Sequence, residues 1–152
     1  MAASITAVRG GDGGSPGSTT TGDYIEIVFS DNTNKGVANT VYTKAELDVA
    51  LTFSASPATN YSGSWPSQNV LRITLLAPPT ASVLIDGTFT ITIQAAADIQ
   101  NTGGSAPCTD IGYLTEGGFQ TGMGFVSACV QSHRLKSRYR DCSPHRVRHS
   151  VF

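Results

Sequence analysis

Short runs in which apolar and polar residues alternate one by one constrain the fold of this chain more than any other feature. In residues 24–29, Ile25, Ile27 and Phe29 share one side of the chain and Glu26 lies on the other. Similar runs occupy residues 4–9, 70–76 and 88–94. Successive side chains of a β-strand point to opposite faces, so this period predicts half-buried strands. Their regular spacing over about 100 residues predicts an all-β domain, an antiparallel β-sandwich.

One segment has a different pattern and predicts a short helix. Thr43-Lys-Ala-Glu46 is a capping box, in which Glu46 can reach back to the amide of Thr43. Apolar residues then follow at helical spacing, and we expect one or two helical turns over residues 44–51. We also expect a strand at 52–55, a turn at 57–63, and a buried Trp65 just before Pro66.

Composition divides the chain near residue 110. Residues 1–110 carry four Lys and Arg against nine Asp and Glu, a net charge of −5, whereas residues 111–152 carry six against two, a net charge of +4. All three histidines also lie in the second part. We therefore predict a β-sandwich domain at 1–110, followed by an irregular, basic tail of low order at 111–152 that contains Cys and His.

A glycine-rich segment follows the first expected strand. Residues 10–22 contain six glycines in thirteen positions and no apolar pattern, which predicts a flexible loop. Such a loop is long enough for residues 4–9 to pair with their own domain or with a neighbouring one. Phe125-Val-Ser-Ala-Cys-Val130 alternates too and is a second candidate for an exchanged strand. Head-to-tail exchange would build an open filament.

Three segments in a fixed order carry a family resemblance. "GDYIEIVFSDNTN", "YSGSW" with "NVLRITLL", and "GTFTITIQAAADIQNTGGSA" together resemble the immunoglobulin-like repeats of bacterial S-layer proteins and related surface proteins of microbes and algae. The likeness covers residues 4–108, and the family's "DxxGN" turn is present as the variant that begins at Asp98. The resemblance implies an immunoglobulin-like, extracellular and non-enzymatic module, often found in tandem, and it assigns no catalytic residue.

We therefore expect a structural module of a surface protein, fibril or layer that assembles through strand or edge contacts with itself or with neighbouring domains. The N-terminus has no apolar signal region, which is typical either of an intracellular protein or of a fragment. Together with the resemblance, this favours a fragment of an extracellular or cell-surface protein. The alternative is a carbohydrate-binding or adhesion module that stacks glycans on Tyr24, Tyr42, Tyr61 or Trp65, unless these aromatics belong to the core.

We do not expect an enzyme, because the acidic domain has no histidine and no cysteine before Cys108, and no carboxylate pair with an interpretable spacing. We also expect no cofactor and no membrane span, because no stretch approaches about 18 apolar residues. Four cations and Tyr139 lie between Arg134 and Arg140, a mixture that could bind the phosphates of RNA or a membrane surface. A run of this size is more often a solvated segment, and its composition also fits translated sequence beyond a coding boundary, so we predict no nucleic-acid partner.

The sequence predicts no metal site. Counted from Asp31, the EF-hand positions 3, 5 and 12 are Thr33, Lys35 and Tyr42, so an EF-hand loop is excluded. A cage of Asp12, Asp23 and Asp31 at one end of the sandwich is an alternative to simple turns at the strand ends. The candidates for zinc lack ordered turns and the tight ligand spacing of a structural site; they are Cys129, His133, Cys142, His145 and His149. The odd number of cysteines allows one disulfide and one free or intermolecular thiol among Cys108, Cys129 and Cys142.

Asn60-Tyr61-Ser62 is the sequon of the chain, and it lies in a predicted turn. A glycan on Asn60 would meet no packing conflict there, which makes this residue the candidate glycosylation site.

Overall fold

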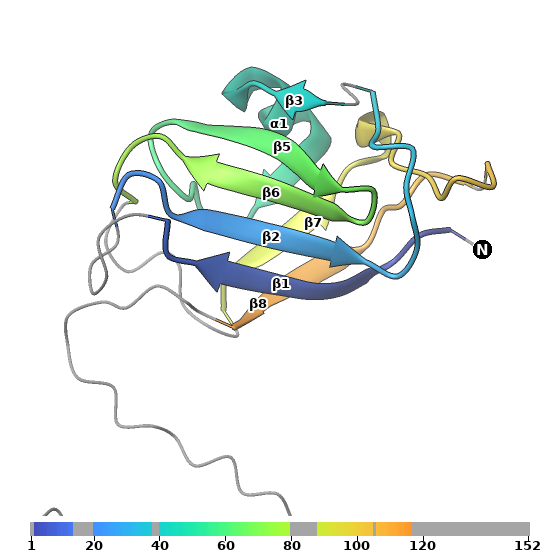
Figure 1. Ribbon diagram of the computed structural model, residues 1–152, viewed down its shortest axis with the longest axis horizontal. Coiled ribbons are helices and arrows are strands. Elements are labelled where there is room, and N and C mark those ends of the chain that lie inside the picture. Colours follow the sequence, from blue (N-terminus) through green and yellow to red (C-terminus); the bar gives the residue numbers. More distant parts are fainter. Residues whose placement is uncertain (1, 14–19, 38–39, 80–87, 105, 117–152) are drawn as a thin grey trace, which may run out of the picture.

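The computed structural model describes residues 2–13, 20–37, 40–79, 88–104 and 106–116, and these ranges consist mainly of β-strands with one α-helix (Figure 1). The elements are β1 (Ile5–Gly11), β2 (Tyr24–Phe29), β3 (Val41–Tyr42), α1 (Lys44–Ala50), β4 (Leu51–Phe53), β5 (Tyr61–Ser67), β6 (Val70–Leu75), β7 (Thr90–Ile93), the 3-10 turn η1 (Ala95–Ala97) and β8 (Ile111–Glu116). The all-β prediction is confirmed. Our zinc candidates, the strand expected at 125–130 and residues 117–152 of the predicted basic tail lie outside the described residues.

The strands form one sheet in the order β3-β5-β6-β2-β1-β8-β7-β4. This sheet curls, so that β7 and β8 pass behind the layer of β6, β2 and β1 (Figure 1). The expectation of a purely antiparallel arrangement was wrong, because β1 pairs with β8 in parallel, with Val8 opposite Leu114 and Arg9 opposite Glu116. The other pairs are antiparallel, and the sheet is therefore mixed.

The core lies inside the curl and is filled by every second residue of the strands. Ile25, Ile27 and Phe29 of β2 are at most 1% exposed, as the alternation predicted. The inward residues of β6 and β7 are buried in the same way; they are Leu71, Ile73, Leu75, Ile91 and Ile93. Burial of each such side chain contributes about 1.5–3 kcal/mol. This shared apolar layer holds the two halves of the curled sheet together.

The predicted helix is confirmed with its capping box. In α1, the hydroxyl of Thr43 accepts from the amide of Glu46 at 3.4 Å, and the carboxylate of Glu46 accepts from the amide of Thr43 at 2.7 Å. These two bonds satisfy backbone donors that the first turn of a helix leaves without partners. Leu47 and Ala50 are buried, so the helix covers one end of the core.

Two boundaries differ from the predictions. The turn expected at 57–63 ends earlier, because β5 begins at Tyr61 and pairs with β6. The sheet also continues beyond the expected domain end at residue 110, since β8 pairs with both β1 and β7. Asp110 stands at this junction, and its carboxylate accepts from the amide of Ile5 at 2.9 Å. The last described strand therefore lies in the sheet next to the first.

Candidate functional site

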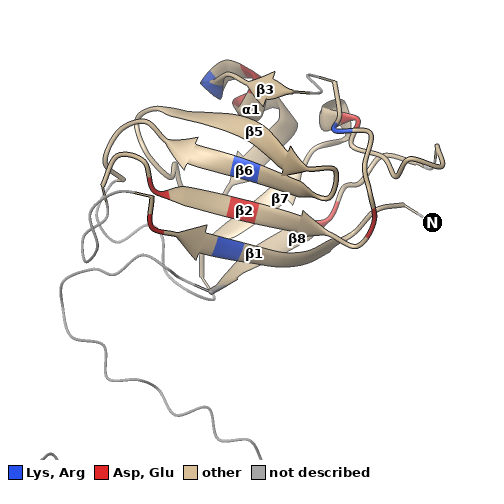
Figure 2. Cartoon of the chain, in the orientation of Figure 1, with Lys and Arg blue, Asp and Glu red and all other residues tan. Residues whose placement is uncertain are grey.

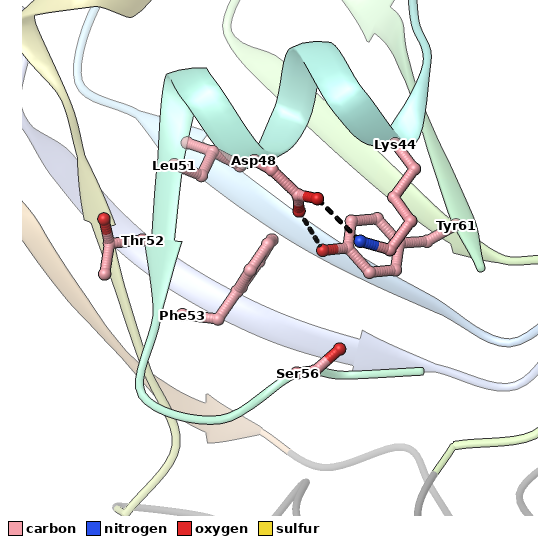
Figure 3. A pocket seen from close by; sticks show the side chains of 7 residues that line it. All are labelled: Lys44, Asp48, Leu51, Thr52, Phe53, Ser56 and Tyr61. Atoms are coloured by element: carbon pink, nitrogen blue, oxygen red, sulfur yellow. Dashed lines mark hydrogen bonds and ion pairs between the residues drawn. The ribbon is translucent and has the colours of Figure 1, made fainter. Parts of the chain in front are cut away.

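A shallow hollow of about 290 Å³ lies between α1, β4 and the start of β5 (Figure 3). The side chains that line it are Lys44, Asp48, Leu51, Thr52, Phe53, Ser56 and Tyr61. Lys44 and Asp48 stand one turn apart on α1, and their side chains meet at 2.6 Å. The hydroxyl of Tyr61 donates to the other oxygen of Asp48, and the ammonium of Lys44 lies 4.9 Å from the centre of the tyrosine ring.

These three groups stabilise one another's ordinary charge states. The hydrogen bond from Lys44 lowers the pKa of Asp48, and the same bond raises the pKa of Lys44. Burial, and then the bond to Asp48, raises the pKa of Tyr61. A general acid or base works best with a pKa near the working pH, whereas all three of these values move away from neutrality. The geometry of the hollow therefore suits a structural contact that holds α1 against β5 better than it suits proton transfer.

The proposed cage of three aspartates is contradicted. Asp23 precedes β2 and Asp31 follows it, so a strand with a rise of about 3.3 Å per residue holds them roughly 25 Å apart (Figure 2). The buried carboxylate of Asp23 instead accepts from the amides of Gly13 at 3.3 Å and Thr20 at 2.8 Å. It thereby joins the two described sides of the glycine-rich segment. In the part of the chain that the structure describes, no group of three or more His, Cys, Asp or Glu residues could hold a metal ion.

The polar turn after β2 is organised by Asn34. Its side-chain oxygen accepts from the amides of Gly36 at 3.0 Å and Gln100 at 2.9 Å, and its amide nitrogen donates to the carbonyl of Asp98 at 2.9 Å. Gly36 has a φ of +67°, and a Cβ there would lie 2.4 Å from the carbonyl oxygen of Ala97. This segment, which matches an EF-hand loop only at Asp31 and Gly36, is thus bonded to the segment that follows η1.

The four aromatic residues proposed as stacking platforms are all engaged within the protein. Tyr42 and Tyr61 are at most 2% exposed, and Trp65 is 9% exposed and stacks on Phe29 with ring centres 5.7 Å apart. Tyr24 is half-buried beneath the guanidinium of Arg72, which lies 4.2 Å from the ring centre. The prediction that Trp65 is buried is confirmed, and these rings contribute to packing.

Sequence reasoning missed Tyr113, whose side chain is 55% exposed on β8. The alternation of residues 113–115 could have identified it, because Leu114 is buried and Thr115 is exposed, which places Tyr113 on the outer face. The change of charge predicted a domain end at residue 110, so no strand was expected here.

Asn60 is exposed immediately before β5, and its carbonyl accepts from the amide of Leu76 at 2.9 Å. The neighbouring Tyr61 is buried, whereas the asparagine side chain faces solvent. Its glycosylation stays a prediction.

Cys108 is 1% exposed, and burial raises the pKa of its thiol. A buried thiol with a raised pKa forms little thiolate and reacts slowly. The other two cysteines and the three histidines lie outside the described residues. The expectation that these residues form no zinc site, and the disulfide hypothesis, therefore stay predictions.

No helix in the described ranges is both long and apolar enough to cross a membrane. Comparisons with protein-family models, with curated proteins and with solved structures found no match for this chain.

Proposed function

We propose that the curled sheet is an immunoglobulin-like sandwich. Without the two-residue strand β3, the order of the sheet divides into β5-β6-β2-β1 and β8-β7-β4. Lettered along the chain from A to G, these groups are D-E-B-A and G-F-C, the two sheets of the immunoglobulin constant-type arrangement. The parallel pair of β1 and β8 joins the two groups at one edge. Helix α1, between the second and third strands of this scheme, is an addition to it.

The module is a structural unit of an extracellular or cell-surface array, fibril or layer. The observation that carries this proposal is the parallel pairing of the first and last described strands. Because β1 and β8 run in the same direction side by side, the described chain enters at one end of the sheet and leaves at the other (Figure 1). Modules connected in this way form a line, and tension along that line passes directly between two adjacent strands.

Contacts between neighbouring modules complete the proposed assembly. The sheet ends at β3 and β4, which contain two and three residues, so these strands offer only short edges for pairing. Residues 4–9 were our candidate for exchange, and the strand they belong to lies between β2 and β8. Exchange would therefore place a neighbour's first strand in this same position.

Electron microscopy of the native material, labelled with an antibody against residues 2–116, tests the structural role. We expect label at regular intervals along filaments or across a layer. Label on isolated molecules that do not touch one another would contradict the proposal.

The second candidate, a carbohydrate-binding or adhesion module, is favoured by one observation, the exposed ring of Tyr113. Flat aromatic faces stack on sugar rings. A glycan array with the full chain and its Tyr113→Ala variant tests this function. Selective binding that the variant loses would support a glycan-binding module, and an array without selective binding would argue against it.

A further inference from the structure

The outer surface of β4, β7 and β8 is uncharged at the positions whose side chains the structure describes. Its outward residues are Thr52 of β4, Thr90 and Thr92 of β7, and Ile111, Tyr113 and Thr115 of β8; we call this surface the neutral face. The strand register places Thr92 between Thr52 and Ile111, and Thr90 beside Tyr113, so these side chains form one continuous patch. The side-chain amide of Gln94 donates to the hydroxyl of Thr52 at 2.9 Å and fixes one corner of the patch.

The outer surface of β1, β2 and β6 has the opposite character. Arg72 of β6 contacts Glu26 of β2 at 2.7 Å, and the register places Arg9 of β1 on the other side of Glu26 (Figure 2). Opposite charges on adjacent strands stabilise each other in such a row. The charged surface thus has partners within the chain, whereas Ile111 and Tyr113 on the neutral face remain 50% and 55% exposed.

We propose that the neutral face packs against the neutral face of a second copy of this chain, related to it by a two-fold axis. A two-fold contact must be self-complementary, which an uncharged surface satisfies without placing like charges together. Contact between copies through β1, β2 and β6 would instead have to desolvate the charged row of Arg9, Glu26 and Arg72. Contact through the neutral face desolvates no charge and covers two apolar side chains. This inference rests on the proposed structural role and identifies the surface that makes the lateral contact.

The size of the neutral face predicts a weak contact. Three strands about 4.8 Å apart and some five residues long cover roughly 250 Å² in projection, which is well below the approximately 800 Å² per partner of a stable interface. We therefore expect monomers in dilute solution and paired copies where modules are held together, because a short connection gives effective concentrations in the millimolar range.

Nuclear magnetic resonance spectra of the full chain, kept reduced and recorded from about 0.05 to about 2 mM, test the proposal in the range of these effective concentrations. We expect concentration-dependent shifts of backbone amides in β4, β7 and β8. Ile111→Lys and Tyr113→Lys each place a cation on both sides of the two-fold contact, and we expect each to weaken self-association at least tenfold. Val41→Lys is the matched control, because Val41 is 61% exposed on β3, at the other end of the strand order, and should leave association unchanged.

Each other outcome overturns the proposal. Spectra that do not change with concentration, or shifts that persist in both lysine variants, exclude the neutral face as a site of self-association. Binding of a neutral polysaccharide to a chain that stays monomeric would assign the face to a glycan instead. If microscopy still shows ordered arrays in either case, the structural role stands and only this interface fails. Circular dichroism and melting curves of each variant confirm that it is folded.

Discussion

A methyl group at Gly112 would collide with the side chains of β1 where the first and last strands meet. A Cβ built there lies 2.5 Å from Cγ2 of Val8 and 3.0 Å from Cγ2 of Ile5, both within the range that forces a neighbour to move. Val8 has no exposed surface, so its side chain has no open space to enter. Overpacking of this kind costs about 1–3 kcal/mol, and we expect Gly112→Ala to lower the free energy of unfolding by that amount.

A double-mutant cycle shows whether the loss arises between these two strands. Val8→Ala removes the colliding atom and costs roughly 2 kcal/mol by itself, from two buried methyl groups at about 0.8 kcal/mol each plus a residual cavity. In the double variant the methyl group introduced by Gly112→Ala occupies part of the vacated space. We therefore expect the loss in the double variant to be smaller than the sum of the single losses by about 1 kcal/mol, a coupling typical of residues in contact.

Urea denaturation of the full chain, followed by circular dichroism, measures these differences. The matched control is Gly103→Ala, because a Cβ there meets nothing closer than 3.4 Å. We expect it to change stability by less than about 0.5 kcal/mol. Additive losses at Val8 and Gly112, or a loss at Gly112 no larger than that of the control, would refute the close packing of β1 on β8.

Three further predictions concern pH, thiol chemistry and force. Burial raises the pKa of Tyr61, so the stability it contributes is fully present below about pH 10 and is lost as the pH rises through the raised pKa. Alkaline denaturation should therefore be less steep in Tyr61→Phe, and equal slopes in both proteins would contradict this effect. In a chain with Cys129→Ser and Cys142→Ser, a thiol reagent should modify Cys108 about 1,000-fold more slowly than in urea, because the residue must first become exposed; modification at the unfolded rate would show that the site is open. Single-molecule pulling through residues 2 and 116 shears the parallel pair of β1 and β8, whereas pulling through residues 2 and 109 opens it from one end. The first geometry should rupture at the higher force, and equal forces would show that this pair does not bear the load.

Local patterns predicted the parts of the fold that depend on near neighbours. The alternation of Ile25, Ile27 and Phe29 determined which face of β2 is buried, because a strand next to an apolar core has no other way to bury them. The capping box of Thr43 and Glu46 depends on residues three apart, and it is present as predicted.

The predictions that were wrong concern strand direction and boundaries, which depend on residues far apart in the sequence. The parallel pairing of Val8 with Leu114 joins strands more than 100 residues apart, and neither strand's alternation specifies the direction of its partner. Gly63 and Pro66 are typical of turns, and a turn was predicted at 57–63. Both residues instead lie in β5, which begins at Tyr61 and pairs with β6. The change of charge near residue 110 indicated a boundary, although the sheet needs the following strand beside β1.

For the candidate site, the sequence identified residue types but not their surroundings. Tyr61 was proposed as a ligand platform, yet its ring packs against Phe53 and its hydroxyl binds Asp48. Tyr61 is buried because α1 and β4 lie against β5, and no local sequence pattern predicts this packing. The exposed Tyr113 was predictable from its own alternation once β8 is included in the domain.

The central claim is that the first and last described strands of one chain lie side by side in parallel. Isotope-edited nuclear Overhauser spectra of a mixed sample, in which half of the chains carry ¹³C and half carry ¹⁵N, test it directly. The account predicts contacts of Val8 with Leu114 and of Arg9 with Glu116 within uniformly labelled chains. Antiparallel contacts between these strands, or no contacts at all, would contradict the account, and contacts found only between differently labelled chains would show that β1 is exchanged between molecules.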